Sequence, residues 1–312
     1  MTLPKEFLEY PHRRHGMDHD LYEWSNLFAR PPVRWPDEAL IALWITPVLE
    51  YFPIVPNDGP FRAPGHMMIP YPDLRTYSTR EYGTRVGAYR LFEALDRFNL
   101  KASVAMNAAV AQRYPLVARD VVQRDWEIIA HGVDMNSLHY GGLDEAAERG
   151  YIEETVDTLR RVSGQPVTGW LSPARSQSEN TLHLLPEYGI EYCCDWVNDD
   201  MPYVMQTRGG ELVAMPHTYE IEDRNFIVTL GHSEAAYADM LIATFDTLYE
   251  EARTHGGRIL HLGLTPYVIG LPFRIKALEK ALDYFMQKTD VWSATSAEIL
   301  QNWRKSSVSD TL

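Results

Sequence analysis

The sequence predicts a parallel α/β fold of a size that fits a single α/β barrel. Residues 39–48 form a nearly continuous apolar run, ALIALWITPV, as expected of a parallel strand buried on both faces. After it, strand-like and helix-like segments alternate with short connections. The chain has 312 residues, 45% of them apolar and 23% charged, which is enough to build one large core.

The predicted strands are short apolar runs that each end at polar residues. They cover residues 39–48, 102–106, 126–130, 167–171, 190–194, 258–264 and 291–293. The predicted helices carry apolar residues at helical spacing between these runs. They cover residues 85–98, 115–124, 144–162, 178–188, 233–254, 271–286 and 296–304. Residues 51–80 are dense in proline and glycine, which predicts a long irregular segment of a kind that is often functional.

The chain divides into three predicted parts. Residues 1–38 are rich in His, Arg, Pro and Trp without a clear period, which indicates an extended arm. Residues 39–306 form the barrel. We expect residues 307–312 to be a disordered tail.

Charge and cysteine usage narrow the class of protein. Asp plus Glu outnumber Lys plus Arg by 43 to 29, and the densest basic cluster is Arg13-Arg14, which argues against nucleic acid and membrane surfaces as partners. The only cysteines, Cys193 and Cys194, are adjacent, which indicates buried reduced thiols. The sequence shows no signal-peptide apolar region and no run of about 18 apolar residues, so we expect a cytoplasmic protein.

In such folds chemistry gathers just after the strands, and the first candidates follow two of them. Glu50 ends the first strand, His131 ends the strand in WEIIAHG, and His139 lies eight residues later. Two imidazole nitrogens and one carboxylate suit zinc with an open position for water. Glu50, His131 and His139 are therefore the candidate metal ligands, with a divalent metal such as zinc as the candidate cofactor. The alternative is a site without metal, in which the histidines cap backbone groups.

Further candidates follow the later strands. Ser172 and Arg175 precede a predicted helix, where they could bind a substrate oxygen or stabilise an oxyanion. Asp195 follows the next strand, and we assign it an orienting role. His261 lies within strand 258–264 and Thr265 at its end. The sequence contains no GxGxxG, P-loop, GxSxG, CxxC or HExxH pattern, so nucleotide binding has no support.

Five segments, taken in order, resemble the polysaccharide deacetylase (NodB-homology) superfamily. They cover residues 81–108, 126–132 (WEIIAHG), 162–181 (with GWLSPARSQ), 189–203 and 266–274 (PYVIGLPFR). The chain is most similar to the bacterial allantoinase-like and cyclic-imidase-like branch. The resemblance implies a distorted (β/α) barrel of about seven strands, with the site at the strand carboxyl ends.

The resemblance also shows where this chain departs from the metal-dependent members. Val48 stands where those members have a base, Met135 where the second histidine of an HxxxH pair should be, and Thr265 where a late catalytic histidine should be. Only Glu50 and His131 match. We treat His139 and His261 as possible displaced substitutes for the missing histidines.

The resemblance implies a hydrolase of C–N bonds in a small cyclic amide, imide or ureide. Glu50, His131 and His261 are the candidate catalytic residues. The candidate substrate-binding residues are Tyr82, Arg85, Ser172, Arg175, Asp195 and Thr265. Two alternatives stay open: a deacetylase of an N-acetyl sugar, and a catalytically lapsed barrel that binds a ligand. The resemblance also implies self-assembly, because several relatives form tetramers. The arm has little core of its own to join, so we expect a homo-oligomer, either a dimer or a tetramer.

Overall fold

The computed structural model describes residues 18–55, 59–65 and 72–309, with side chains up to residue 306. The first 17 residues of the expected arm and the last three of the expected tail lie outside this range. Helix α10 (Ser296–Ser309) includes residues 307–309, where we expected the disordered tail to begin.

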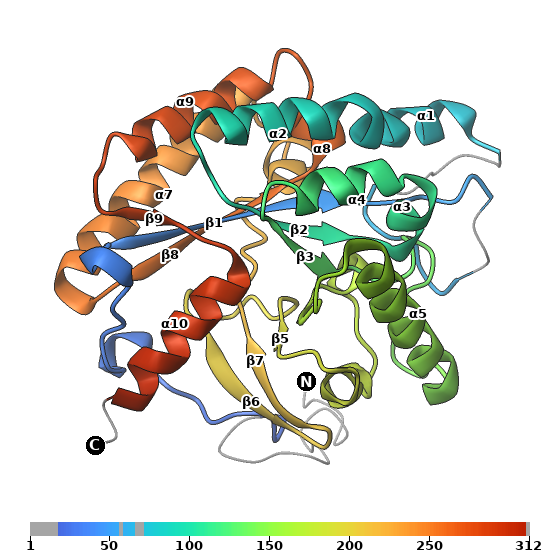
Figure 1. Ribbon diagram of the computed structural model, residues 1–312, viewed down its shortest axis with the longest axis horizontal. Helices are drawn as coiled ribbons and strands as arrows, with labels where there is room; N and C mark the ends of the chain where they lie inside the picture. The colour runs from blue at the N-terminus through green and yellow to red at the C-terminus, as the bar shows by residue number, and fades with distance from the viewer. Residues whose placement is uncertain (1–17, 56–58, 66–71, 310–312) are drawn as a thin grey trace, which may run out of the picture.

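A curled, mostly parallel sheet forms the centre of the fold (Figure 1). The strand order is β6-β7-β5-β4-β3-β2-β1-β8, and β9 pairs with the start of β1. Among the strands of the described residues, only β6 runs antiparallel, against β7. The strands are β1 (Ile41–Leu49), β2 (Ser103–Met106), β3 (Glu127–Ala130), β4 (Gly169–Trp170), β5 (Tyr192–Cys193), β6 (Tyr203–Thr207), β7 (Gly210–Ala214), β8 (Arg258–Leu264) and β9 (Val291–Ser293). This arrangement confirms the predicted distorted barrel, because seven parallel strands run from β7 to β8.

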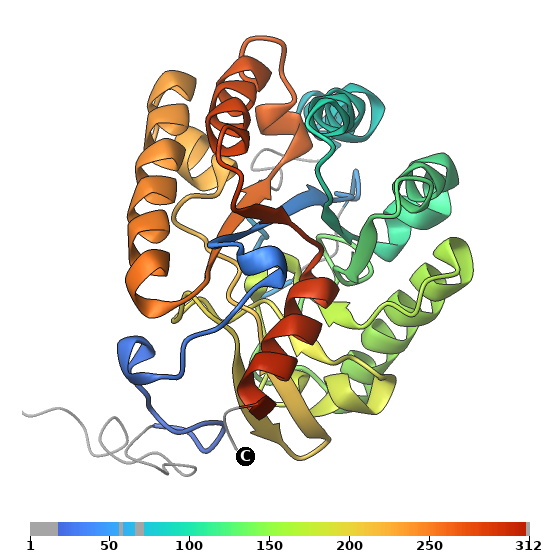
Figure 2. The same ribbon diagram turned by 60° about the vertical axis from the view of Figure 1, so that its left-hand side comes forward.

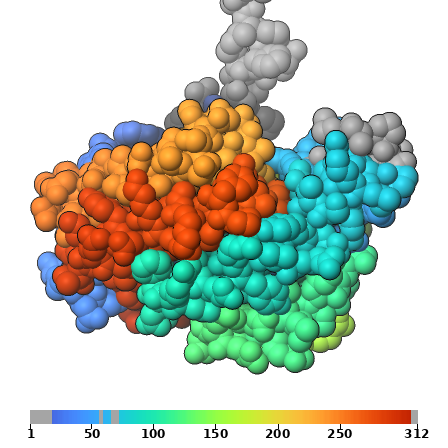
Figure 3. Space-filling view, turned by 90° about the horizontal axis from the view of Figure 1, so that it is seen from above, coloured from blue at the N-terminus to red at the C-terminus, as the bar shows by residue number. Residues whose placement is uncertain are grey.

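Helices cover the outside of the curled sheet (Figure 2), except that α10 packs Ile299 and Leu300 into the core inside it. They are α1 (Leu74–Tyr82), α2 (Ala88–Arg97), α3 (Ala108–Arg113), α4 (Pro115–Val122), α5 (Glu145–Ser163), α6 (Thr181–Leu184), α7 (Glu234–His255), α8 (Pro266–Ile269), α9 (Ile275–Met286) and α10. Figure 3 shows α9 and α2 side by side on one outer face. The contacts of α9 with both α7 and α2 make this layer continuous.

Strand β1 explains why the sheet is buried on both faces. All nine of its residues are buried. Leu43 and Ile45 pack into the outer core beneath the helices. Trp44 and Val48 pack into the inner core that fills the barrel. The alternation of side chains along a strand thus places apolar residues on both sides, as its continuous apolar sequence predicts.

The structure corrects three parts of the sequence prediction. Helix α1 begins at Leu74, inside the segment 51–80 that we expected to be irregular. The predicted helix 178–188 is instead the short α6 followed by a 3-10 turn, Leu185–Tyr188, whose second residue is Pro186. The prediction also missed the β6–β7 hairpin, although Gly209-Gly210 between two apolar runs is a hairpin signal.

The described part of the arm lies against the amino end of the barrel. Trp35 is buried in the inner core, and its indole Nε1 donates to the Arg258 carbonyl at 3.0 Å. The Gln206 backbone N–H donates to the Leu21 carbonyl at 2.8 Å, which joins the arm to edge strand β6. Within the described ranges, no helix combines the length and apolar character needed to cross a membrane.

Gly87 marks a close approach between the turn that precedes α2 and the start of α8. It ends a π-helical turn, Gly83–Gly87, between α1 and α2, and an added Cβ would lie 2.8 Å from the Pro266 carbonyl carbon and closer still to its oxygen. We expect Gly87→Ala to lower the free energy of unfolding by about 1–3 kcal/mol through overpacking. Gly141→Ala is the control, because a Cβ there meets open space. Equal urea-unfolding curves for the two variants would contradict this packing.

Candidate active site

Glu50 lies at the carboxyl end of β1 and is the most heavily contacted carboxylate of the candidate site. Its side chain is only 1% exposed. Nη1 of Arg224 donates to both of its oxygens, at 2.9 and 3.0 Å. The Tyr267 hydroxyl donates to Oε2 at 3.2 Å. Burial alone would raise the pKa of Glu50, but Arg224 and His131 together lower it from 4.5 to about 2. Glu50 is therefore a buried, ionised carboxylate.

His131 follows β3 and faces Glu50. Its Nδ1 lies 2.7 Å from the Leu171 carbonyl oxygen, which can only accept, so Nδ1 carries a hydrogen. In the neutral ring Nε2 is then a free lone pair, and it lies 3.9 Å from Glu50 Oε1. Among the described residues Nε2 has no hydrogen-bond partner. Asn107, after β2, fixes the spacing between the two strand ends, because it donates to the His131 carbonyl and accepts from the Tyr51 N–H.

A strained turn after β4 places Arg175 at the site. Ala174 and Arg175 have φ values of 59° and 53°, which are unusual for residues other than glycine. Gly132, with φ of 70°, allows the turn to approach, since a Cβ there would lie 2.7 Å from Pro173 Cδ. The AHG and SPAR segments of the sequence therefore pack directly on each other.

Ser172 and Asp195 hold this turn in place. The Ser172 N–H donates to Asp195 Oδ1 at 2.7 Å, and Gln177 Nε2 donates to Oδ2 at 2.6 Å. The Trp170 indole donates to the Ser172 hydroxyl at 2.8 Å. Asp195 thus orients the turn that carries Ser172.

The loop after β7 supplies charged residues that sequence reasoning missed. Arg224 Nη2 lies 3.2 Å from Glu222 Oε1, and Arg175 Nη2 lies 3.0 Å from Glu222 Oε2. Glu222 is therefore a buried bridge between the two arginines. Glu222 and Arg224 follow β7, a strand that the sequence prediction lacked. Tyr267 lies in the PYVIGLPFR segment but was not singled out.

Two histidines stack beside this charged cluster. His217 Nδ1 accepts from Arg175 Nη2 at 2.7 Å, and the His217 and His261 ring centres are 3.9 Å apart. His261 Nε2 lies 3.1 Å from the Thr46 hydroxyl. Burial lowers the pKa of both rings well below the usual value, and for His217 the nearby His261 and Arg175 add to this effect. Both are therefore neutral, and His261 lies behind His217 rather than beside Glu50.

These side chains enclose a very small cavity of about 10 Å³. A volume of this size has room for about one water molecule. Its lining includes Glu50, His131, Ser172, Arg175, His217, Glu222 and Arg224. The structure thus brings together four of the predicted site residues, namely Glu50, His131, Ser172 and Arg175.

Other predicted residues lie elsewhere. His139 Nδ1 lies 2.8 Å from Glu148 in a separate buried cluster with Ser178 and Thr181. The Tyr82 hydroxyl accepts from Arg90 at 2.7 Å, and Arg85 is exposed beside Glu81.

Thr265 lies at the end of β8 but does not line the small cavity. Its N–H donates to both oxygens of Asp223, each at 2.9 Å. The contact ties the end of β8 to the loop after β7.

The arrangement does not fit the candidate metal site. No group of three or more His, Cys, Asp or Glu side chains within the described ranges could hold a metal ion. The guanidinium of Arg224 occupies both oxygens of Glu50, where a cation would bind, and His139 is paired with Glu148 instead. Glu50, His131 and His139 are therefore not brought together as ligands.

Comparison with known proteins agrees with this fold. Residues 72–193 match the family model for polysaccharide deacetylase. A Schizosaccharomyces pombe protein that bears the name polysaccharide deacetylase is 25% identical over 240 residues, covering 72% of this chain and 74% of its own.

Two solved structures are similar over almost their whole length. A probable polysaccharide deacetylase from Pseudomonas aeruginosa PAO1 is 29% identical with a TM-score of 0.79, covering 90% of this chain and 98% of its own. A PuuE allantoinase is 27% identical with a TM-score of 0.79, covering 90% of this chain and 97% of its own. The match over residues 72–193, together with the similarity of the whole barrel to both solved structures, makes polysaccharide deacetylase the family that this chain resembles.

Proposed function

We propose that the protein hydrolyses the C–N bond of a small cyclic amide, imide or ureide. The observation that carries this proposal is the His131–Glu50 pair, which lines a water-sized cavity together with Arg175 and Arg224. Similarity to the allantoinase structure over 90% of the chain supports a C–N hydrolase in general, and supports a cyclic substrate in particular. Substrate entry requires side chains around the cavity to move, because the cavity is smaller than any such ring.

His131 is the proposed general base. Its Nδ1–H is held by the Leu171 carbonyl, so Nε2 is the atom that can take a proton from water. The water oxygen then attacks the substrate carbonyl carbon. Glu50, held ionised 3.9 Å from Nε2, stabilises the imidazolium that forms.

Arg175 and Arg224 are the proposed donors for the oxyanion. Both guanidinium groups line the cavity, and a buried charged donor stabilises developing negative charge more strongly than it would in water. Glu222 contacts both arginines and fixes their positions. As the tetrahedral intermediate collapses, the C–N bond breaks and the leaving nitrogen takes a proton.

Tyr267 is a proposed source of that proton. Its hydroxyl contacts Glu50 and accepts from Arg224 at 3.3 Å, so it lies at the edge of the same site. Burial, together with the charge of Glu50, raises the pKa of Tyr267, which keeps the hydroxyl protonated at neutral pH. The imidazolium of His131 then reprotonates the tyrosine.

A second candidate function is deacetylation of an N-acetyl sugar, favoured by the family-model match. Both reactions hydrolyse an amide, so the products separate them. We expect hydantoin, succinimide or allantoin to yield a ring-opened acid, measured by alkali uptake at constant pH. Release of acetate from N-acetylglucosamine, with no ring opening, would favour the deacetylase instead. No turnover in either assay would favour a binding protein.

The His131–Glu50 pair gives a kinetic prediction. On a confirmed substrate we expect His131→Gln to lower kcat by about 10²- to 10⁴-fold through loss of the base. Glu50→Gln should also lower kcat, and the double variant should be little worse than His131→Gln, because the two residues act as one unit. Fully multiplicative losses in steady-state kinetics would show that they act independently.

The Glu50–Arg224 pair gives a pH prediction that needs no substrate. The pKa of Glu50 falls from 4.5 to about 2 on folding, so its contribution to stability is complete above about pH 4.5 and is lost as the pH falls toward 2. Urea unfolding should show Arg224→Met destabilised by up to about 3 kcal/mol at pH 7. The difference from the wild type should shrink steadily below pH 4.5.

Arg253→Met is the matched control for this measurement. Arg253 pairs with Glu250 at 3.1 Å on the surface, with both side chains more than half exposed. Its loss should change stability by less than about 0.5 kcal/mol at any pH. A pH-independent deficit in Arg224→Met would mean that this arginine acts through packing and not through the charge of Glu50.

A further inference from the structure

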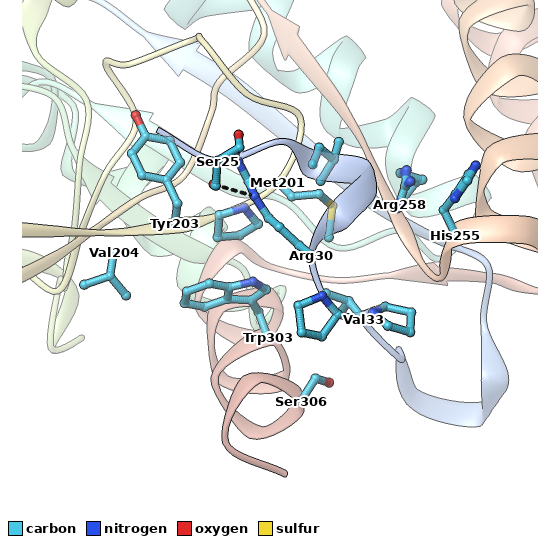
Figure 4. A pocket seen from close by; sticks show the side chains of 14 residues that line it. Ser25, Arg30, Val33, Met201, Tyr203, Val204, His255, Arg258, Trp303 and Ser306 are labelled. Atoms are coloured by element: carbon cyan, nitrogen blue, oxygen red, sulfur yellow. Dashed lines mark hydrogen bonds between the residues drawn. The ribbon is translucent and has the colours of Figure 1, made fainter. Parts of the chain in front are cut away.

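A second cavity lies at the opposite end of the barrel from the candidate active site. Its volume is about 360 Å³, within the range of small-molecule sites. Arm residues 25–33 form one side, β6 another, and the end of α10 a third (Figure 4). Arg258, at the start of β8, lines it, whereas Gly263 near the end of β8 lies beside His217 of the candidate active site. The seven residues of β8 span about 20 Å, so the two cavities are separate.

Two arginines in this cavity each keep one nitrogen without a partner. Nε of Arg30 donates to the Ser25 hydroxyl at 2.9 Å, and its Nη2 lies 2.6 Å from Asp199. Its Nη1 has no hydrogen-bond partner in the described part of the protein. Arg258 is 3% exposed, and it too has two paired nitrogens and one without a partner among the described residues. Its Nε donates to Glu251 and its Nη1 to the Gly256 carbonyl. Its Nη2 has no hydrogen-bond partner within the described ranges.

The rest of the lining is largely apolar and aromatic. Figure 4 shows Arg30 crossing the middle of the cavity, with the rings of Tyr203 and Trp303 toward one end and Arg258 toward the other. Val33, Met201 and Val204 are further apolar members of the wall. A buried guanidinium nitrogen without a partner is costly, and an anion is the group that satisfies it best.

We propose that this cavity binds a small carboxylate with an apolar, aromatic-sized body. The carboxylate pairs with Arg30, whose side chain is 23% exposed and can turn its free Nη1 toward a ligand, and the body packs against Tyr203 and Trp303. Arg258, which is paired with Glu251, lies at the far end of the cavity. Because the ligand bridges the arm, β6 and α10, it ties the arm to the barrel. The site is independent of the catalytic proposal.

The probe is 2-naphthoate, with 2-naphthylmethanol as its uncharged counterpart of similar shape. Isothermal titration calorimetry should show 1:1 binding of naphthoate, at least about tenfold tighter than the alcohol. Arg30→Gln should remove this difference. Arg34→Gln, an exposed arginine of the same segment outside the cavity, should leave it unchanged. Val204→Trp, which enlarges a side chain of the cavity wall, should weaken the binding of both compounds.

The variant Glu50→Gln tests whether naphthoate binds in this cavity or in the candidate active site. Its naphthoate affinity should equal that of the wild type, because the active site lies at the other end of the barrel. No saturable naphthoate binding at millimolar concentration would overturn the proposal. Binding that survives both Arg30→Gln and Val204→Trp, or that is lost in Glu50→Gln, would also overturn it.

Discussion

The buried ion pair between Glu50 and Arg224 is the contact on which the candidate site depends. It joins the end of β1 to the loop after β7, two segments 174 residues apart in sequence. Burying two charges carries a large desolvation cost, which only close geometry and further hydrogen bonds can offset. Here Tyr267 donates to Glu50, and Glu222 contacts the other side of the arginine. Removing one partner would leave an uncompensated charge in the core.

Loops at the neighbouring strand ends place His131 and Arg175 close to this ion pair. Asn107 ties the ends of β1, β2 and β3 together, so His131 reaches Glu50 from a neighbouring strand. The strained turn at Ala174 brings Arg175 in from β4, where it meets Glu222. Polar side chains thus converge from several strand ends, which is the usual way in which a parallel barrel builds a site.

The sequence predicted the fold better than the site. Continuous apolar strands and helical spacing are local signals, and they located most elements, while the weaker β6–β7 hairpin was overlooked. Glu50, His131 and Ser172 share one cavity because each comes just after a strand, and the turn after β4 adds Arg175. His139 does not join them, since sequence spacing does not reveal which way a loop turns. Arg224 is close to Glu50 only through the fold, and no local pattern marks it. The expected oligomer and the cytoplasmic location remain predictions.

An arginine, and not a metal ion, neutralises Glu50 in the proposed C–N hydrolase. The most direct measurement is elemental analysis of untagged protein, combined with ring opening of hydantoin, succinimide and allantoin before and after treatment with a chelator. The account predicts far less than one divalent ion per chain and an unchanged rate after chelation. A near-stoichiometric divalent ion that disappears in the Glu50→Ala, His131→Ala variant, with turnover that returns only when metal is restored, would contradict it.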